Sequence, residues 1–125
     1  IPIPPQPLPT IENFRLQWVG STEVCVYATP NTYETYSLTG PSNNQEYVWN
    51  PTAGYVEIFA DGVLVADNGG ENKPYVRVTG LNNGQTYSFS YKTTDSRGNS
   101  AIATGVSGTL GNTGLTNYRP DGTSC

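Results

Sequence analysis

The sequence predicts an all-β protein, a two-sheet antiparallel sandwich of about seven strands. Apolar and polar residues alternate over several short segments, as they do in half-buried strands. Turn signals rich in Gly, Asn and Asp separate these segments, and no stretch shows helical periodicity. The chain holds 14 Gly and 10 Pro in 125 residues, which favours short strands around a single core.

The expected strands lie at residues 11–18, 24–27, 56–60, 63–65, 75–78, 87–94 and 101–110. Asp61-Gly62 is a two-residue turn signal, so the segments on either side of it form a hairpin. Alternation selects the side chains that face one another between the sheets. The predicted core consists of Val24, Val26, Val56, Ile58, Val76, Val78, Leu81, Tyr87, Phe89 and Tyr91.

The run VRVTGLNNGQTYSFSYKTTDSRGNSA, which begins at Val76, is the most distinctive part of the chain. Leu81 and Tyr87 stand six positions apart around Asn83-Gly84. This region resembles the E, F and G strands of fibronectin type III domains, an immunoglobulin-like family. The resemblance implies a tyrosine corner, in which the buried Tyr87 hydroxyl bonds upstream backbone.

Two other segments extend the resemblance: residues 11–28 look like strands A and B, and residues 56–65 look like strand C and its successor. The sequence departs from the family where Ala28 replaces the usual strand-B tryptophan. It also departs in a long connection between strands B and C. Trp18 and Trp49 are the candidates to refill the core.

Residues 1–10 contain prolines at positions 2, 4, 5, 7 and 9, which predict a stiff, extended arm. The arm is either a polyproline II linker or a segment that docks on a neighbouring subunit. In the second interpretation Ile1, Ile3 and Leu8 supply the apolar contacts. A start at Ile fits removal of a signal peptide, and it fits an excised piece equally well.

The two cysteines, Cys25 and Cys125, lack the close spacing of a zinc site. We expect them to form a disulfide, the alternative being two unpaired thiols. In the resemblance Cys25 faces outward from its sheet, where the C-terminal tail, residues 111–125, would reach it. Charged residues make up only 13%, and Thr, Asn, Gly and Tyr are abundant, as in exported proteins. The expected location is therefore extracellular or at the cell surface.

Charge and hydropathy exclude several partners. The net charge is −4 and the six Lys and Arg residues are scattered, so nucleic acid is not an expected partner. No apolar run approaches the roughly 20 residues of a membrane-spanning helix. With no histidine, the Ser-His and Cys-His nucleophile pairs are missing, and we expect neither catalysis nor a cofactor.

Two loops carry weak site signals. Residues 67–72 bring two carboxylates and two amides together, which suits either calcium or an ordinary Gly-rich loop; no metal site is predicted. Residues 96–100 fall in the loop where some integrin-binding fibronectin type III domains carry an Arg-Gly-Asp motif, but here Asn99 stands in place of the Asp. We interpret this loop as a plain turn.

Residues 31–54 form an aromatic insertion into the sandwich of residues 11–110. At one pole of the sandwich it would meet the neighbouring loops and present a binding surface. The candidate binding residues are Tyr33, Tyr36, Tyr47, Trp49, Asp67, Glu71, Asp95 and Arg97. The alternative is an extra hairpin whose aromatics cover a sheet edge or fill the core.

The expected function is that of a noncatalytic structural or adhesive module in an extracellular assembly, such as a self-associating filament subunit. Its partners would be neighbouring protein subunits. The alternative is a carbohydrate-binding or spacer module of a secreted glycan-degrading enzyme, with a glycan as partner.

Overall fold

A computed structural model describes residues 1–111 of the chain. This part contains eight β-strands and no helix, so no helix in it is suited to crossing a membrane. The strands are β1 (Thr10–Val19), β2 (Val24–Thr39), β3 (Glu46–Thr52), β4 (Tyr55–Ala60), β5 (Val63–Asp67), β6 (Val76–Val78), β7 (Thr86–Thr94) and β8 (Ser100–Thr109).

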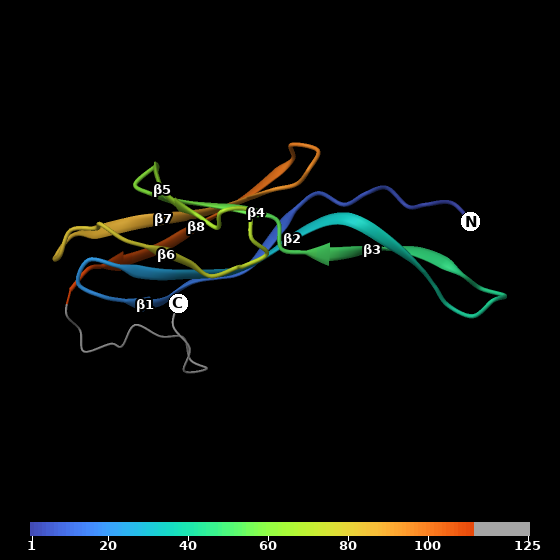
Figure 1. The fold of residues 1–125 in the computed structure, drawn as a ribbon, viewed down its shortest axis with the longest axis horizontal. Helices are drawn as coiled ribbons and strands as arrows, with labels where there is room; N and C mark the ends of the chain where they lie inside the picture. Colours follow the sequence, from blue (N-terminus) through green and yellow to red (C-terminus); the bar gives the residue numbers. More distant parts are fainter. Residues whose placement is uncertain (112–125) are drawn as a thin grey trace.

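The strands form two antiparallel sheets of four strands each, which confirms the all-β sandwich (Figure 1). In the first sheet β2 is central and pairs with β1, β3 and β6. In the second sheet the order is β5-β4-β7-β8. The addition to the expected strand set is β3, together with a β2 much longer than the expected 24–27.

Strand β2 is 16 residues long because it changes partner halfway. Its first part pairs with β6 up to Val26, and its last part pairs with β3 from Thr32 onward. Pro30 lies between these two ladders, opposite Ile11 of β1. Because proline has no N–H, it fits at the point where neither ladder needs a donor.

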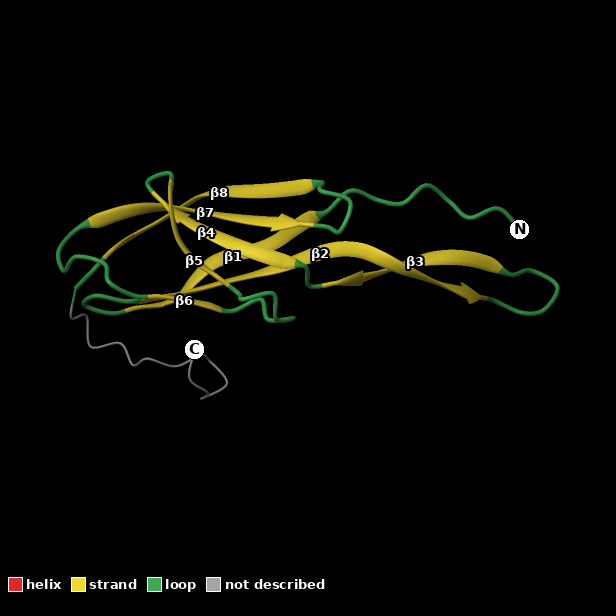
Figure 2. Ribbon diagram, turned by 45° about the horizontal axis from the view of Figure 1, so that its top comes forward, coloured by secondary structure: helices red, strands yellow, loops and turns green. Residues whose placement is uncertain are grey.

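Beyond Pro30, β2 and β3 form a two-stranded hairpin, which we call the ribbon (residues 32–52). The ribbon projects past the sandwich, and the N-terminal arm runs beside it toward the ribbon's tip (Figures 1 and 2). The tip turns at Gly40, whose φ is +98°. The insertion is therefore an extra hairpin, as in the alternative interpretation of residues 31–54, but its aromatic side chains do not fill the core.

The core lies between the sheets, and all ten side chains predicted for it are buried. Ala28 and Leu110 complete it, and the Phe14 ring packs 5.7 Å from the Tyr91 ring. Neither tryptophan belongs to this cluster. Trp18 is buried opposite Cys25 in the β1–β2 register, while Trp49 lies on the ribbon. The space left by Ala28 is thus not refilled by tryptophan.

The tyrosine corner expected from the resemblance is present. Tyr87 is 9% exposed, and its hydroxyl accepts a hydrogen bond of 2.9 Å from the backbone N–H of Asn82. Leu81 is buried beside it and donates its N–H to Thr22 O at 2.9 Å. The first bond closes the turn before β7, and the second ties that turn to the β1–β2 connection.

Cys25 is fully buried and alternates with the core residues Val24 and Val26, so it belongs to the other face of its sheet. Its expected partner Cys125 lies outside the described residues, as does the tail after Gly111. The disulfide therefore stays a prediction.

Candidate functional site

The ribbon has one aromatic face. Tyr36 is the cross-strand partner of Trp49, and Leu38 is the partner of Tyr47. A bulge between Tyr33 and Thr35 shifts the register by one residue, which returns Tyr33 to the same face. This bulge could not be inferred from the sequence. Without it, alternation would place Tyr33 and Tyr36 on opposite faces.

The rings on this face pack edge to face. The Tyr36 ring lies 5.3 Å from Tyr47 at 88° and 5.0 Å from Trp49 at 74°. The opposite face is mainly polar, and there Asn50 Nδ2 donates to Ser37 Oγ at 2.8 Å. The ribbon is thus a thin, two-sided element with no core of its own.

The proline-rich arm contacts the ribbon and the turn after β7. Trp49 Nε1 donates to Pro4 O at 2.9 Å, and an Arg97 Nη donates to Pro7 O at 2.9 Å. The Gln6 side chain donates to Tyr33 O. Where the arm meets β1, Asn31 Nδ2 donates to Thr10 Oγ1 at 3.2 Å. The arm therefore lies along its own chain, outside the core.

The turn between β7 and β8 is organised by Asp95, which is 7% exposed. Its carboxylate accepts the backbone N–H groups of Arg97 at 3.0 Å and Asn99 at 2.9 Å. The Arg97 guanidinium adds an ion pair of 2.7 Å. Burial acts to raise the pKa of Asp95, but the hydrogen bonds from Asn99 and the charge of Arg97 outweigh it and lower the pKa.

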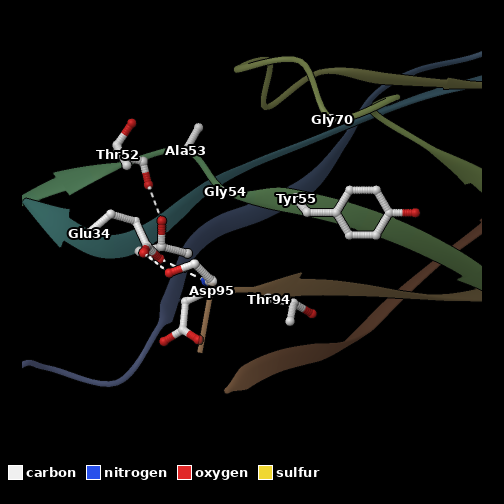
Figure 3. Close-up of a pocket in the computed structure, with 10 residues that line it drawn as sticks. Glu34, Thr52, Ala53, Gly54, Tyr55, Gly70, Thr94 and Asp95 are labelled. Atoms are coloured by element: carbon white, nitrogen blue, oxygen red, sulfur yellow. Dashed lines mark hydrogen bonds between the residues drawn. The ribbon is translucent and has the colours of Figure 1, made fainter. Parts of the chain in front are cut away.

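A hollow of about 330 Å³ lies where the ribbon joins the sandwich (Figure 3). Its lining includes Glu34, Thr52 and Gly54 from the ribbon and its exit, and Thr94 and Asp95 from the end of β7. The Glu34 carboxylate accepts hydrogen bonds from the N–H and the hydroxyl of Ser96. Glu34 therefore fixes the base of the ribbon to the β7–β8 turn.

The loop at residues 67–72 is built around Asn68, which is 9% exposed. Its amide donates to Gly54 O at 3.0 Å and to Glu71 O at 2.8 Å, and its oxygen accepts the N–H of Val56 at 3.2 Å. Asn68 thus joins its own loop to the segment at the start of β4, and its side-chain amide is already occupied by these bonds. In the part of the chain that the structure describes, no group of three or more acidic or cysteine side chains is placed to hold a metal ion.

The predicted binding residues separate into three groups. Tyr33, Tyr36, Tyr47 and Trp49 share the aromatic face of the ribbon. Asp95 and Arg97 form one turn, which meets the arm through Arg97.

Asp67 and Glu71 lie apart from both of these groups, and Asp67 interacts with the Tyr55 side chain of the neighbouring strand. Asp67 accepts the N–H of Gly69 at 2.7 Å, and Glu71 pairs with Lys73 at 3.0 Å on the surface.

Sequence reasoning missed Glu34 and Gly54, whose partners lie far away in the chain and leave no local signal. It identified Asn68 only as one amide of the loop at residues 67–72 and missed its bonds to Gly54 and Val56.

The surface formed by the ribbon and the β7–β8 turn offers contact area and hydrogen-bond donors. The Asp95 and Glu34 carboxylates are both occupied by donors from the β7–β8 turn. The arrangement is suited to holding an extended, acceptor-rich segment of chain, as it holds its own arm. Comparison with family models, with curated proteins and with solved structures finds no match for this chain.

Proposed function

We propose that the chain is a noncatalytic structural or adhesive module that self-associates in an extracellular or cell-surface assembly. One observation carries the proposal: a ribbon and an arm project together from the sandwich (Figure 2), and both bear exposed apolar side chains. An element without a core gains little stability from such side chains unless a neighbour covers them.

The exposures support association. Ile1 is 68% exposed, Ile3 47% and Leu8 65% on the arm, and the ribbon adds Tyr36 at 45% and Leu38 at 47%. Within residues 1–111, β3 pairs with no strand except β2. Its other edge therefore offers backbone donors and acceptors beside apolar side chains, a combination that favours contact with another chain.

The geometry favours a protein partner over a glycan. A sugar ring stacks best on a flat aromatic platform, whereas Tyr36 stands at 88° and 74° to its two neighbours. The indole N–H of Trp49, which would recognise a sugar hydroxyl, is already bonded to Pro4 O. These features weigh against the carbohydrate-binding alternative.

The strand order supports a fibronectin type III-like relationship. In the resemblance β1, β2 and β6 take the places of strands A, B and E, and β5, β4, β7 and β8 take those of C′, C, F and G. The Tyr87 hydrogen bond adds the corner expected of such domains. We propose this relationship on topology and the corner together.

A disulfide between Cys25 and Cys125 belongs to the same proposal, because an extracellular location permits it. Alkylation of the native protein without reductant, followed by intact-mass measurement, is expected to label neither thiol. Labelling of both would remove this support for export.

The native mass of the full chain tests the proposed function. Sedimentation from about 1 μM to about 1 mM is expected to show concentration-dependent association. Retardation in glycan affinity gels by a strictly monomeric chain would replace the proposal with the carbohydrate-binding alternative.

Deletion of residues 1–8 tests the arm. Because the described contacts of this segment are hydrogen bonds near the surface, the melting temperature is expected to change little while association is lost. Unchanged association after the deletion would make the arm a linker only.

A further inference from the structure

We propose that the arm-binding side of the ribbon is an exchange site, at which residues 1–8 of a second copy replace the chain's own arm. Each copy then donates its arm to one neighbour and accepts an arm from another. The inference rests on the proposed self-association and adds to it the contact that joins the copies.

The chemistry of arm binding does not depend on the arm belonging to the same chain. Prolines lack the N–H of a strand but keep their carbonyls, so the arm offers mainly acceptors. The body of the protein supplies the matching donors, Trp49 Nε1 to Pro4 O and the Arg97 guanidinium to Pro7 O. An arm from another copy presents the same carbonyls to the same donors.

The chain's own arm is held incompletely. Its apolar side chains Ile1, Ile3 and Leu8 are 68%, 47% and 65% exposed, so docking within one chain leaves them in water. Tyr36 and Leu38 of the ribbon are also about half exposed, at 45% and 47%. A second copy brought alongside by an exchanged arm can cover both sets, which docking within one chain does not do.

The structure also shows where the arm would pivot. Pro9 is buried, and Thr10, the first residue of β1, is bonded to Asn31. Residues 1–8 precede this anchor, and in polyproline II form they span about 25 Å. Prolines on both sides of Leu8 keep the segment extended, which favours reaching a neighbour over folding back.

Donor and receptor are different surfaces of one chain, so exchange joins copies head to tail. Such a contact produces a ring or an open filament, depending on the rotation between neighbours. The chain's own arm competes with an effective concentration on the order of 1 mM, so exchange is expected toward the upper end of the sedimentation range and not in dilute solution.

Full-length variants test the exchange by sedimentation at a concentration where the unmodified chain associates. Trp49→Phe removes the same indole hydrogen bond from the chain's own arm and from an exchanged arm, so it is expected to change association less than about 3-fold. Trp49→Ala removes the receptor side chain and is expected to weaken it about 30-fold or more. Ile102→Ser, on the exposed face of the second sheet, is the matched control and should associate normally.

The Trp49→Ala variant retains its arm but lacks the receptor side chain, so it can donate an arm without accepting one. It should therefore end the polymer that it joins. Added to the unmodified chain, it is expected to shorten the polymers in proportion to its mole fraction. An excess of a synthetic peptide of residues 1–10 should have the same effect.

If Trp49→Ala associates normally, or neither it nor the peptide shortens the polymers, the exchange is overturned and self-association stands. If the unmodified chain stays monomeric throughout, both proposals fail. Melting temperatures near that of the unmodified chain show that the variants are folded.

Discussion

Single side chains hold the loops of this protein in place. Tyr87, Asp95 and Asn68 each bond backbone groups of a loop or turn. Of the three arrangements, only the tyrosine corner was predicted from the sequence, because the spacing of Leu81 and Tyr87 resembles that of fibronectin type III domains. The Asn68 amide donates to Gly54 O, and the Glu34 carboxylate accepts the N–H of Ser96. The two residues of each pair are far apart in the sequence, so no local pattern predicts these bonds.

The Tyr87 hydroxyl is expected to contribute measurably to stability. Tyr87→Phe keeps the buried ring but leaves the N–H of Asn82 without its acceptor. We expect a loss of about 1 to 2 kcal/mol in the free energy of unfolding, measured by chemical denaturation. Tyr36→Phe, at an exposed tyrosine, is the control and should change stability by less than about 0.5 kcal/mol. If the two variants lose the same free energy of unfolding, the hydrogen bond of the tyrosine corner does not stabilise the protein.

Asp95 is expected to make stability depend on acid pH. Its folded-state pKa is lowered, so the unfolded chain, with a pKa of about 3.9, takes up the proton first. The contribution is therefore complete above about pH 5 and is lost as the pH falls through the folded pKa.

Asp95→Asn should be less stable at neutral pH and should lose less stability between neutral pH and about pH 3. Denaturant midpoints across this range measure both effects. Parallel pH profiles for the two chains would show that Asp95 does not carry the dependence.

At the scale of elements, the long strand β2 decides the architecture. The sequence identified its first residues by the alternation of Val24, Cys25 and Val26, but its continuation was interpreted as an insertion. Pro30 argues against a central strand, and the residues after Thr32 lack a buried apolar face. The strand continues because β6 and β3 pair with it on either side of the proline.

Gly54 sets the passage from the ribbon to β4. A Cβ at this position would lie 2.5 Å from Thr32 Cγ2 and 3.1 Å from Thr94 O. We expect Gly54→Ala to cost about 1 to 3 kcal/mol by overpacking. Thr32→Ser removes the clashing methyl group and keeps the hydroxyl that donates to Thr52 O.

The double variant is therefore expected to be more stable than the sum of the two single changes implies. A double-mutant cycle from denaturation curves measures this coupling. Simple additivity would show that the strain at Gly54 comes from its other close contacts, Thr93 Oγ1 and Thr94 O at 3.1 Å, and not from Thr32.

At the scale of the molecule, the sandwich and the ribbon are distinct parts. The sequence predicted the sandwich and its core because burial imposes alternation on the strands. It did not specify how far the ribbon projects or that the arm lies on it, since neither feature is encoded by buried alternation. The core cluster contains no residue of the arm or the ribbon, so the sandwich is expected to fold without the ribbon.

Thr32 and Thr52 are cross-strand partners, so an Asn-Gly turn can join them in place of residues 33–51. The free energy of unfolding of this shortened chain is expected to lie within about 2 kcal/mol of that of the unmodified chain. The bonds that it loses, such as Glu34 to Ser96, lie near the surface. It is also expected to lose self-association, since the receptor for the arm is gone. A matched control replaces only the tip, residues 40–45, by Asn-Gly between the partners Thr39 and Glu46 and should still associate. Denaturation and sedimentation of both chains test these expectations. If the shortened chain fails to fold, the ribbon is part of the folding unit. If the shortened chain folds and associates normally, the assembly contact lies on the sandwich.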